Sequence, residues 1–271
     1  MSFVRRYEQA DPQRVNRWLA QSGVCSRREA EALIAQGLVS IDGETVSDAG
    51  RKISHGQTLT LADAADAKLD GGFTVMLHKP VGVVSAQPEA GQVPAIRLLT
   101  RQTLFGASPT IPDRDTRLAP VGRLDMASRG LLLLSDDGVV AKAVIGPESA
   151  LDKEYRVAVI GELTPEKLDL LRHGLELDDR RLKPAEVEII SDQRLRMVLH
   201  EGRNRQIRRM CDALGATVKN LHRVRIMNVK IGNLKIGQWE NIPQPLLEEL
   251  FQSVNRADLS KTSEELAESE E

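Results

Sequence analysis

The sequence predicts an α+β fold, with a small amino-terminal domain followed by a larger domain built on a mixed sheet. Its 271 residues are about twice the usual length of one domain. Strand-like segments dominate from Phe73 onward, without the regular strand–helix alternation of a doubly wound parallel sheet. Small and polar residues over 63–72 are typical of a linker. We therefore expect domains at 1–62 and 73–254, and a disordered acidic tail at 255–271.

The amino-terminal domain begins with two short predicted helices between residues 14 and 36. Ser26 followed three positions later by Glu29 forms a capping box, which marks the start of the second helix. Gly37 supplies the left-handed exit that ends many helices. Two alternating runs then flank Asp42-Gly43, a dipeptide that predicts a tight β-hairpin turn.

The larger domain is predicted mainly from short apolar and β-branched runs between turn residues. Leu131–Leu134 has no polar position, so this strand must be buried. Thr164 before Pro165 marks a helix start, because proline fits the first helical position. The expected strands are Gln57–Leu61 in the small domain and Thr74–Leu77, Leu118–Val121, Leu131–Leu134, Glu154–Ile160, Leu195–His200 and Val224–Val229 in the larger one. The expected helices of the larger domain are Thr164–His173, Asn204–Leu214 and Pro245–Val254.

Charge is distributed unevenly, although the formal net charge is only -2. Eleven lysines and arginines lie between Arg194 and Lys235, against two acidic residues. Six acidic residues lie between Ala257 and Glu271, against one lysine. A concentrated basic segment indicates a polyanionic partner, and its simpler interpretation is a solvated basic face. The low aromatic content of 3% disfavours a platform on which RNA bases stack.

Several function classes lack their sequence signals. There is no long apolar run or signal core, so we expect a cytoplasmic protein without a membrane segment. Cys25 and Cys211 are too few and too far apart for a disulfide framework or a structural zinc site, and we expect them to be packing residues. Phosphate-loop, dinucleotide-binding and zinc-protease motifs are missing, and the five histidines are scattered. No cofactor or metal is expected.

A loop before the apolar strand places a carboxylate at the mouth of the predicted sheet. Asp125 follows Arg123 by two positions, and Gly130 turns the chain into the strand Leu131–Leu134. Such an aspartate either caps the loop through backbone N–H groups or serves as a nucleophile or base, and the residues alone favour the cap. The run 136–138, Asp-Asp-Gly, is most simply a solvated turn.

A second constellation combines arginines with a helix start at 201–211. Asn204 can cap a helix whose Ile207, Met210 and Cys211 face inward. Arg205, Arg208 and Arg209 then lie near its first turn, where two would contact phosphates. One could instead pair with Asp125 through a two-pronged guanidinium.

Three separated motifs together resemble the RsuA-type ribosomal RNA pseudouridine synthases. They are the Gly-Arg-Leu-Asp run from Gly122 through Gly138, the strand Lys153-Glu154-Tyr155, and the run Gly202 to Met210. Residues 14–60 resemble the small alpha-L, or S4-like, RNA-binding domain. The run Arg225 to Val229 and the following Gly-Gln-Trp resemble the RluF branch most, which acts on large-subunit RNA. The resemblance implies a mainly antiparallel catalytic sheet, a 23S rRNA partner and no cofactor; we expect a monomer.

The resemblance also implies roles for individual residues. Isomerising uridine breaks the N1–C1′ bond and forms a bond from C5 after the base is flipped from its stack. Asp125 is then the essential carboxylate, which either attacks the uracil or the sugar as a nucleophile or removes the C2′ hydrogen as a general base. Tyr155 stacks on the uracil, and Arg208 pairs with Asp125. Arg123 fills the gap left by the base, and Leu221 packs on the other uracil face unless it is only a core residue. Further substrate contacts are expected from Arg203, Arg205, Gln206 and Arg209, and RNA anchoring from Arg14, Arg17, Arg27 and Arg28.

Rival functions remain open at this point. A non-catalytic RNA-binding or ribosome-assembly factor would use the same small domain and basic segment, but has no use for Asp125, Tyr155 and Arg208 together. The same chemistry on 16S rRNA or tRNA is a second alternative. A glycosidase or nucleosidase would need a second carboxylate, and none is evident. The long connection Arg101–Arg117 and the acidic end depart from the RluF branch and bear on the RNA target.

Overall fold

The computed structural model describes residues 3–22, 24–65, 72–113, 116, 118–145 and 151–250. The chain forms two compact units, Met1–Thr74 with Ser135–Lys142, and Val75–Leu134 with Ala143–Glu271. Most of the predicted linker and the whole predicted acidic tail lie outside the described residues. Within the described part, no helix is long and apolar enough to cross a membrane.

The first unit contains two helices and a small sheet, as predicted from the sequence. The Ser26 side chain accepts from the Glu29 amide at 3.1 Å, and the Glu29 carboxylate accepts from the Ser26 amide, so the capping box is confirmed. Asp42 and Gly43 both have positive φ, at 49° and 84°, as the predicted hairpin turn requires. The elements are β1 (Val4–Arg6), β2 (Gln13–Arg14), α1 (Val15–Gln21), α2 (Arg27–Ala35), β3 (Val39–Ile41), β4 (Glu44–Thr45), β5 (Lys52–Ile53) and β6 (Thr58–Leu61).

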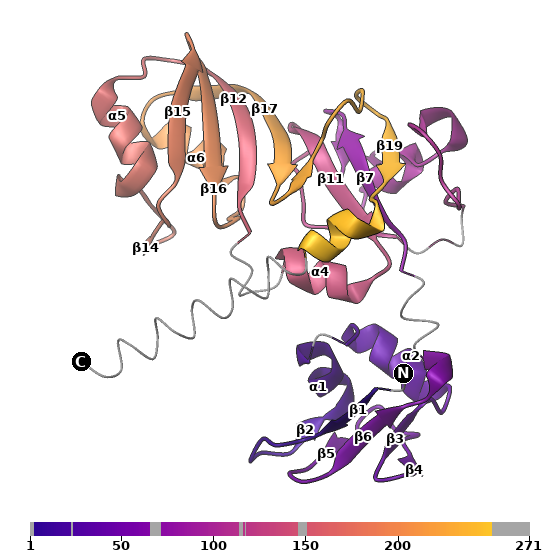
Figure 1. The fold of residues 1–271 in the computed structure, drawn as a ribbon. Coiled ribbons are helices and arrows are strands. Elements are labelled where there is room, and N and C mark those ends of the chain that lie inside the picture. The colour runs from indigo at the N-terminus through magenta and orange to yellow at the C-terminus, as the bar shows by residue number, and fades with distance from the viewer. Residues whose placement is uncertain are drawn as a thin grey trace, which may run out of the picture. The chain divides into compact units, whose positions relative to one another are not determined.

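The second unit is built on a mixed, mainly antiparallel sheet, which confirms the predicted fold class (Figure 1). The strand order is β15 (Glu186–Ser191), β16 (Arg194–Leu199), β12 (Lys153–Ile160), β17 (Thr217–Ile226), β11 (Arg129–Ser135), β7 (Thr74–Lys79) and β19 (Trp239–Asn241). Strand β10 (Ala119–Val121) pairs with β11, and β18 (Val229–Lys230) pairs with β17. Strands β11 and β17 run parallel, whereas β12 pairs antiparallel with both β16 and β17.

Short strands, helices and helical turns make up the remaining elements between Val83 and Ala213. They are β8 (Val83–Val84), β9 (Val93–Pro94), η1 (Ala95–Leu98), η2 (Arg101–Thr103), α4 (Gly138–Ile145), α5 (Pro165–Asp169), the π turn η3 (Leu170–Gly174), β13 (Glu176–Leu177), β14 (Arg180–Arg181) and α6 (Gln206–Ala213). Residues 244–250 are helical, and the remainder of the predicted helix Pro245–Val254 lies outside the described residues.

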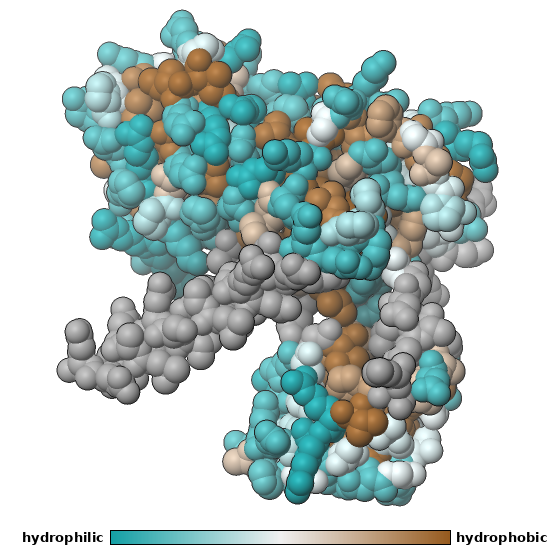
Figure 2. All heavy atoms as spheres, in the orientation of Figure 1, coloured by the Kyte–Doolittle hydropathy of each residue, from teal (hydrophilic) through white to brown (hydrophobic). Residues whose placement is uncertain are grey.

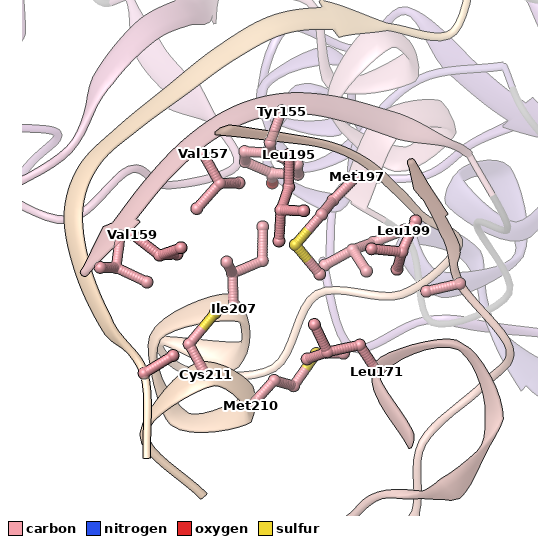
Figure 3. Close-up of a cluster of buried hydrophobic side chains, with 14 of the residues drawn as sticks. Tyr155, Val157, Val159, Leu171, Leu195, Met197, Leu199, Ile207, Met210 and Cys211 are labelled. Carbon is pink, nitrogen blue, oxygen red and sulfur yellow. The ribbon is translucent and has the colours of Figure 1, made fainter. Parts of the chain in front are cut away.

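The core of the second unit lies between α6 and one face of the sheet (Figure 3). Tyr155, Val157 and Leu195 project from the strands towards Ile207 and Cys211 of α6. Burial raises the pKa of the Cys211 thiol to about 12, so this cysteine is an inert packing residue, as predicted. The predicted burial of Leu131–Leu134 is also confirmed, because all four side chains are fully buried.

Three local predictions were wrong. The strand expected at Val224–Val229 is β17, which begins at Thr217 and ends at Ile226, before a turn at Met227 with φ 49°. Asn204 does not cap α6, because Arg205 occupies that position in the left-handed region and makes no side-chain cap. The run 136–138 is not merely a solvated turn, since the Asp137 carboxylate accepts from the Val139 amide at 2.7 Å and starts α4.

Candidate active site

A loop between β10 and β11 carries Asp125 and is bracketed by two glycines. Gly122 and Gly130 have φ of 85° and 119°, in the region that favours glycine. A Cβ atom on Gly130 would lie 2.2 Å from the carbonyl oxygen of Arg223. Glycine at this position therefore lets β11 approach β17 and fixes where the loop ends.

Three polar side chains hold the backbone of the Asp125 loop in place. Ser85 Oγ donates to the Leu124 carbonyl at 2.8 Å and accepts from the Leu124 amide at 2.9 Å. Arg208 donates to the Ala127 carbonyl at 2.9 Å, and Arg223 donates to the Arg123 carbonyl at 3.3 Å. Residues from three distant parts of the sequence thus define the position of the carboxylate.

The Asp125 carboxylate does not cap its own loop. Its side chain is 31% exposed, and no backbone N–H of the described residues donates to it. Arg205 Nη1 lies 3.7 Å and Arg208 Nε 3.9 Å from its Oδ2 atom. The capping role that the residues alone favoured is therefore wrong, and the group faces outward between two positive charges.

Apolar and basic side chains surround Asp125 in a shallow cavity. The cavity volume is about 80 Å³, enough for only a few water molecules. Tyr155 on β12 and Leu221 on β17 form its apolar wall, and both are at least nine-tenths buried. Five other predicted site residues line this cavity with them, Arg123, Asp125, Arg203, Arg205 and Gln206, together with Ser128 of the Asp125 motif. A flat ring could contact Tyr155 and the carboxylate together.

Arg208 is placed beside Asp125 as predicted, but without the two-pronged contact. Its terminal nitrogens donate to the carbonyls of Val218 and Ala127 and to Ser128 Oγ. Only Nε faces Asp125, at 3.9 Å, and Nε has no hydrogen-bond partner. The terminal nitrogens of the guanidinium are therefore engaged by two carbonyls and a hydroxyl, and not by the Asp125 carboxylate.

Three residues expected to contact substrate have their polar groups engaged within the protein. Arg203 donates to the carbonyls of Leu177, Arg180 and Arg181 and pairs with Glu201 at 3.2 Å. Gln206 donates to Glu201 at 3.0 Å and accepts from the Arg203 amide at 2.9 Å. Arg209 forms a two-pronged pair with Asp178, at 2.9 and 2.7 Å. These side chains hold the β13–β14 hairpin to the start of α6.

Arg123 and Arg205 remain at the cavity with exposed side chains. Arg123 is exposed, and its side chain has no partner among the described residues. Arg205 is 48% exposed and has only the 3.7 Å contact to Asp125. A surface contact of this length adds about 0–1 kcal/mol to stability. Both side chains can therefore turn to a bound polyanion at little cost.

Lys79, the last residue of β7, was not singled out from the sequence. It is fully buried, and its ammonium donates to the carbonyls of Pro80 at 2.9 Å and Val83 at 2.7 Å. Burial lowers its pKa to about 8, the charge of Asp125 opposes this change, and Arg223 adds to it. Lys79 could have been singled out from the sequence, because a lysine at the end of an apolar strand is rarely buried unless it has a partner or a functional role.

The four predicted anchoring arginines are all exposed in the first unit. Arg14 ends β2, Arg17 lies on α1, and Arg27 and Arg28 begin α2. No ion pair to any of them occurs among the described residues. Their exposure leaves them free to contact a phosphate backbone.

No group of three or more histidine, cysteine, aspartate or glutamate side chains could hold a metal ion within the described ranges. The cavity is lined by two carboxylates, flanking guanidiniums and the Tyr155 ring. Of the two carboxylates, Glu201 is engaged by Arg203, Gln206 and the Lys183 amide, whereas Asp125 has only the longer contacts to Arg205 and Arg208.

Comparison with known proteins gives matches to both parts of the chain. A family described as RNA pseudouridylate synthase matches residues 74–213, and the S4 domain family matches residues 13–59. An uncharacterized RNA pseudouridine synthase of Aquifex aeolicus is 33% identical, covering 89% of this chain and 94% of that protein. The dual-specificity RNA pseudouridine synthase RluF of Escherichia coli K12 is 31% identical, covering 90% of this chain and 80% of that protein.

Two further similarities extend this result. Ribosomal large subunit pseudouridine synthase B of Bacillus subtilis is 32% identical, covering 83% of this chain and 90% of that protein. A crystal structure of a pseudouridylate synthase superposes with a TM-score of 0.62 at 27% identity, covering 88% of this chain and 99% of that one.

Proposed function

Because this chain belongs to the RNA pseudouridine synthase family, we propose that it converts one uridine of 23S ribosomal RNA to pseudouridine, with Asp125 as the essential carboxylate. The observation that carries this proposal is the placement of Asp125. Its carboxylate is partly exposed, is not used as a cap, and lies in a cavity with Tyr155 and Leu221. The large-subunit target is supported by the name of the Bacillus subtilis relative.

The reaction rearranges one nucleotide without an external group. The N1–C1′ bond breaks, the uracil turns, a C5–C1′ bond forms, C5 loses its proton and N1 gains one. A carboxylate in contact with the sugar or base can start this sequence as a nucleophile or as a base. Asp125 is suited to it because three backbone clamps hold its loop before substrate binds.

Tyr155 and Leu221 supply the surface for the flipped base. Both are largely buried, so their positions are fixed by the core between α6 and the sheet. The Tyr155 ring stacks on uracil, and Leu221 packs on its other face. The cavity of about 80 Å³ is small for a nucleotide, so the exposed side chains of Arg123 and Arg205 move outward when the base enters.

Arg123 fills the gap that the flipped base leaves in the RNA. The exposed arginines of the first unit, Arg14, Arg17, Arg27 and Arg28, anchor the RNA outside the reaction site. The residues proposed for the cavity all lie in the second unit, and we propose that the protein acts as a monomer.

The proposal is tested by tritium release from RNA labelled at C5 of uridine. The full chain is incubated separately with 23S rRNA, 16S rRNA and bulk tRNA, and the modified position is mapped by carbodiimide treatment and primer extension. We expect stoichiometric release from 23S rRNA alone. Release only from 16S rRNA or tRNA would refute the target, and no release from any RNA that binds tightly would favour a non-catalytic RNA-binding factor.

A further inference from the structure

A second cavity lies on the sheet face that points away from α6. Directly paired residues of antiparallel strands point to the same face. Tyr155 and Val157 point towards α6, so Arg156 and Ala158 between and after them point the other way. In Figure 1 the strands β12, β16 and β17 lie in front of α6, and Figure 2 shows mostly hydrophilic side chains with apolar patches on this near side. The second cavity is therefore separate from the one that holds Asp125.

The second cavity is large enough for a nucleotide. Its volume is about 490 Å³, within the range of roughly 300–1,000 Å³ usual for small-ligand sites. Ala158 and Ile190 supply its apolar side chains, whereas Val157 and Leu195 border it through their backbone, because their side chains point towards α6. Its polar rim consists of Arg129, Arg156, Arg194, Asn220 and His222. A cationic rim beside two apolar side chains suits an anion joined to a ribose or base.

Arg156 of this rim pairs with Glu154 at 3.1 Å, but Arg129 and Arg194 are less neutralised than the arginines at the other end of the same face. There, Arg196 pairs with Glu154, Glu186 and Glu188, at 3.1 to 3.4 Å. Arg225 pairs with Asp152 at 2.6 Å. No carboxylate lines the second cavity, and neither Arg129 nor Arg194 has an ion pair among the described residues.

Two buried nitrogen atoms beside the cavity also lack partners. Arg129 Nε and His222 Nε2 are buried, and no described group forms a hydrogen bond with either. His222 stacks on His78, with ring centroids 5.1 Å apart and planes 8° from parallel. Burial and then the charge of Arg129 lower the pKa of His222 to about 4, so its ring is neutral at pH 7. Unsatisfied buried nitrogens of this kind indicate a missing acceptor.

We propose that this cavity binds a phosphate group of the substrate RNA, with part of its nucleotide, at a position outside the reacting uridine. Guanidinium forks match the geometry of phosphate oxygens, and three of them converge here. The choice of RNA rests on the proposed function, whereas the choice of a phosphate anion rests on the cavity itself. The site adds affinity and register without touching the reacting base.

The test removes two exposed guanidiniums and measures RNA binding by the full chain. The variant is Arg156→Ala with Arg194→Ala; Glu154 retains contacts to Arg196 and Arg225 when Arg156 is removed. The dissociation constant for 23S rRNA is measured across salt concentrations. Losing two phosphate contacts should raise it roughly tenfold at low salt and reduce the salt slope by about 1.4, since each contact to a single strand contributes about 0.7. Tritium release at saturating RNA should equal that of the wild type.

A matched control changes two exposed arginines elsewhere in the same unit. Arg97→Ala with Arg101→Ala, in η1 and η2, removes the same charge outside both cavities. This variant should reproduce the wild-type dissociation constant and slope. An equal loss in both variants would show a nonspecific effect of charge and overturn the site.

A third variant adds a negative charge to the cavity and guards against misfolding. Asn220→Asp keeps every arginine and should also weaken RNA binding, with an unchanged melting temperature. Free uridine monophosphate distinguishes the source of the phosphate. Suppose that uridine monophosphate shifts the His222 imidazole resonance in an NMR titration, while the variant of Arg156 and Arg194 binds 23S rRNA with the wild-type dissociation constant. The cavity would then bind free nucleotides and not RNA, and the proposal would be wrong.

These binding results are independent of turnover. A wild-type protein that binds RNA through the cavity but releases no tritium would refute the proposed function and leave the cavity assignment standing. Normal turnover with unchanged RNA binding in both cavity variants would refute the cavity assignment and leave the proposed function standing.

Discussion

Replacing Arg208 with lysine tests whether the guanidinium positions the loop that carries Asp125. The arginine donates to the Val218 carbonyl at 3.2 Å, the Ala127 carbonyl at 2.9 Å and Ser128 Oγ at 3.3 Å. These bonds join α6, β17 and the Asp125 loop through one fork. A lysine keeps the positive charge near Asp125 but cannot reach acceptors on both sides.

The size of the effect follows from the number of bonds lost. A hydrogen bond to a charged group contributes about 1.5–3 kcal/mol, and lysine should lose two of the three. Allowing for relaxation, we expect Arg208→Lys to lower the free energy of unfolding by about 2–4 kcal/mol. A loop displaced by about 1 Å can slow the reaction roughly a hundredfold.

The assay combines urea unfolding, the RNA dissociation constant and the single-turnover rate of tritium release. Arg205→Lys is the matched control, because Arg205 is 48% exposed and reaches Asp125 only at 3.7 Å. The control should change the free energy of unfolding by less than about 1 kcal/mol. If Arg208→Lys weakens RNA binding but keeps the wild-type stability and rate, Arg208 is a phosphate contact and the positioning role is refuted.

Three further predictions concern other parts of the molecule. Gly130→Ala should destabilise the protein by about 1–3 kcal/mol, because its Cβ would meet the Arg223 carbonyl at 2.2 Å; Gly202→Ala, with open space around it, is the control in a thermal melt. In the wild type, the free energy of unfolding should rise between about pH 8 and the ordinary lysine pKa of 10.5, because Lys79 holds its proton more tightly in the unfolded state. This rise should be smaller in Lys79→Met, and identical pH profiles for the two proteins would refute the burial of a charged Lys79 as its cause. Arg27→Ala with Arg28→Ala should raise the RNA concentration for half-maximal rate and leave the saturated rate unchanged, compared with exposed Arg51→Ala, and a fall in the saturated rate alone would contradict an anchoring role.

Local patterns predicted the parts of the fold that local physics determines. The Ser26 and Glu29 capping box needs only residues three positions apart, and the Asp42-Gly43 turn needs only its own backbone angles. The uniform apolar run Leu131–Leu134 likewise admits only a buried strand. In each case the interaction lies within one short segment.

Contacts between residues that are distant in the sequence could not be predicted. The motif predicts Arg203 as a substrate contact, but it does not show that Arg203 also donates to three carbonyls of the β13–β14 hairpin, more than twenty positions away. The electrostatic interactions of Lys79 with Asp125 and Arg223 likewise exist only in the folded structure. No periodicity or spacing in the chain encodes these contacts, because tertiary packing creates them.

The most direct measurement of the central claim is the rate of pseudouridine formation by Asp125→Asn under single-turnover conditions. Asparagine is nearly isosteric, and the loop clamps from Ser85, Arg208 and Arg223 involve backbone atoms that it leaves unchanged. We expect tritium release from 23S rRNA to fall by at least about a thousandfold, since the reacting carboxylate is lost, while RNA affinity and melting temperature match the wild type. Release above about a tenth of the wild-type rate would contradict Asp125 as the essential carboxylate.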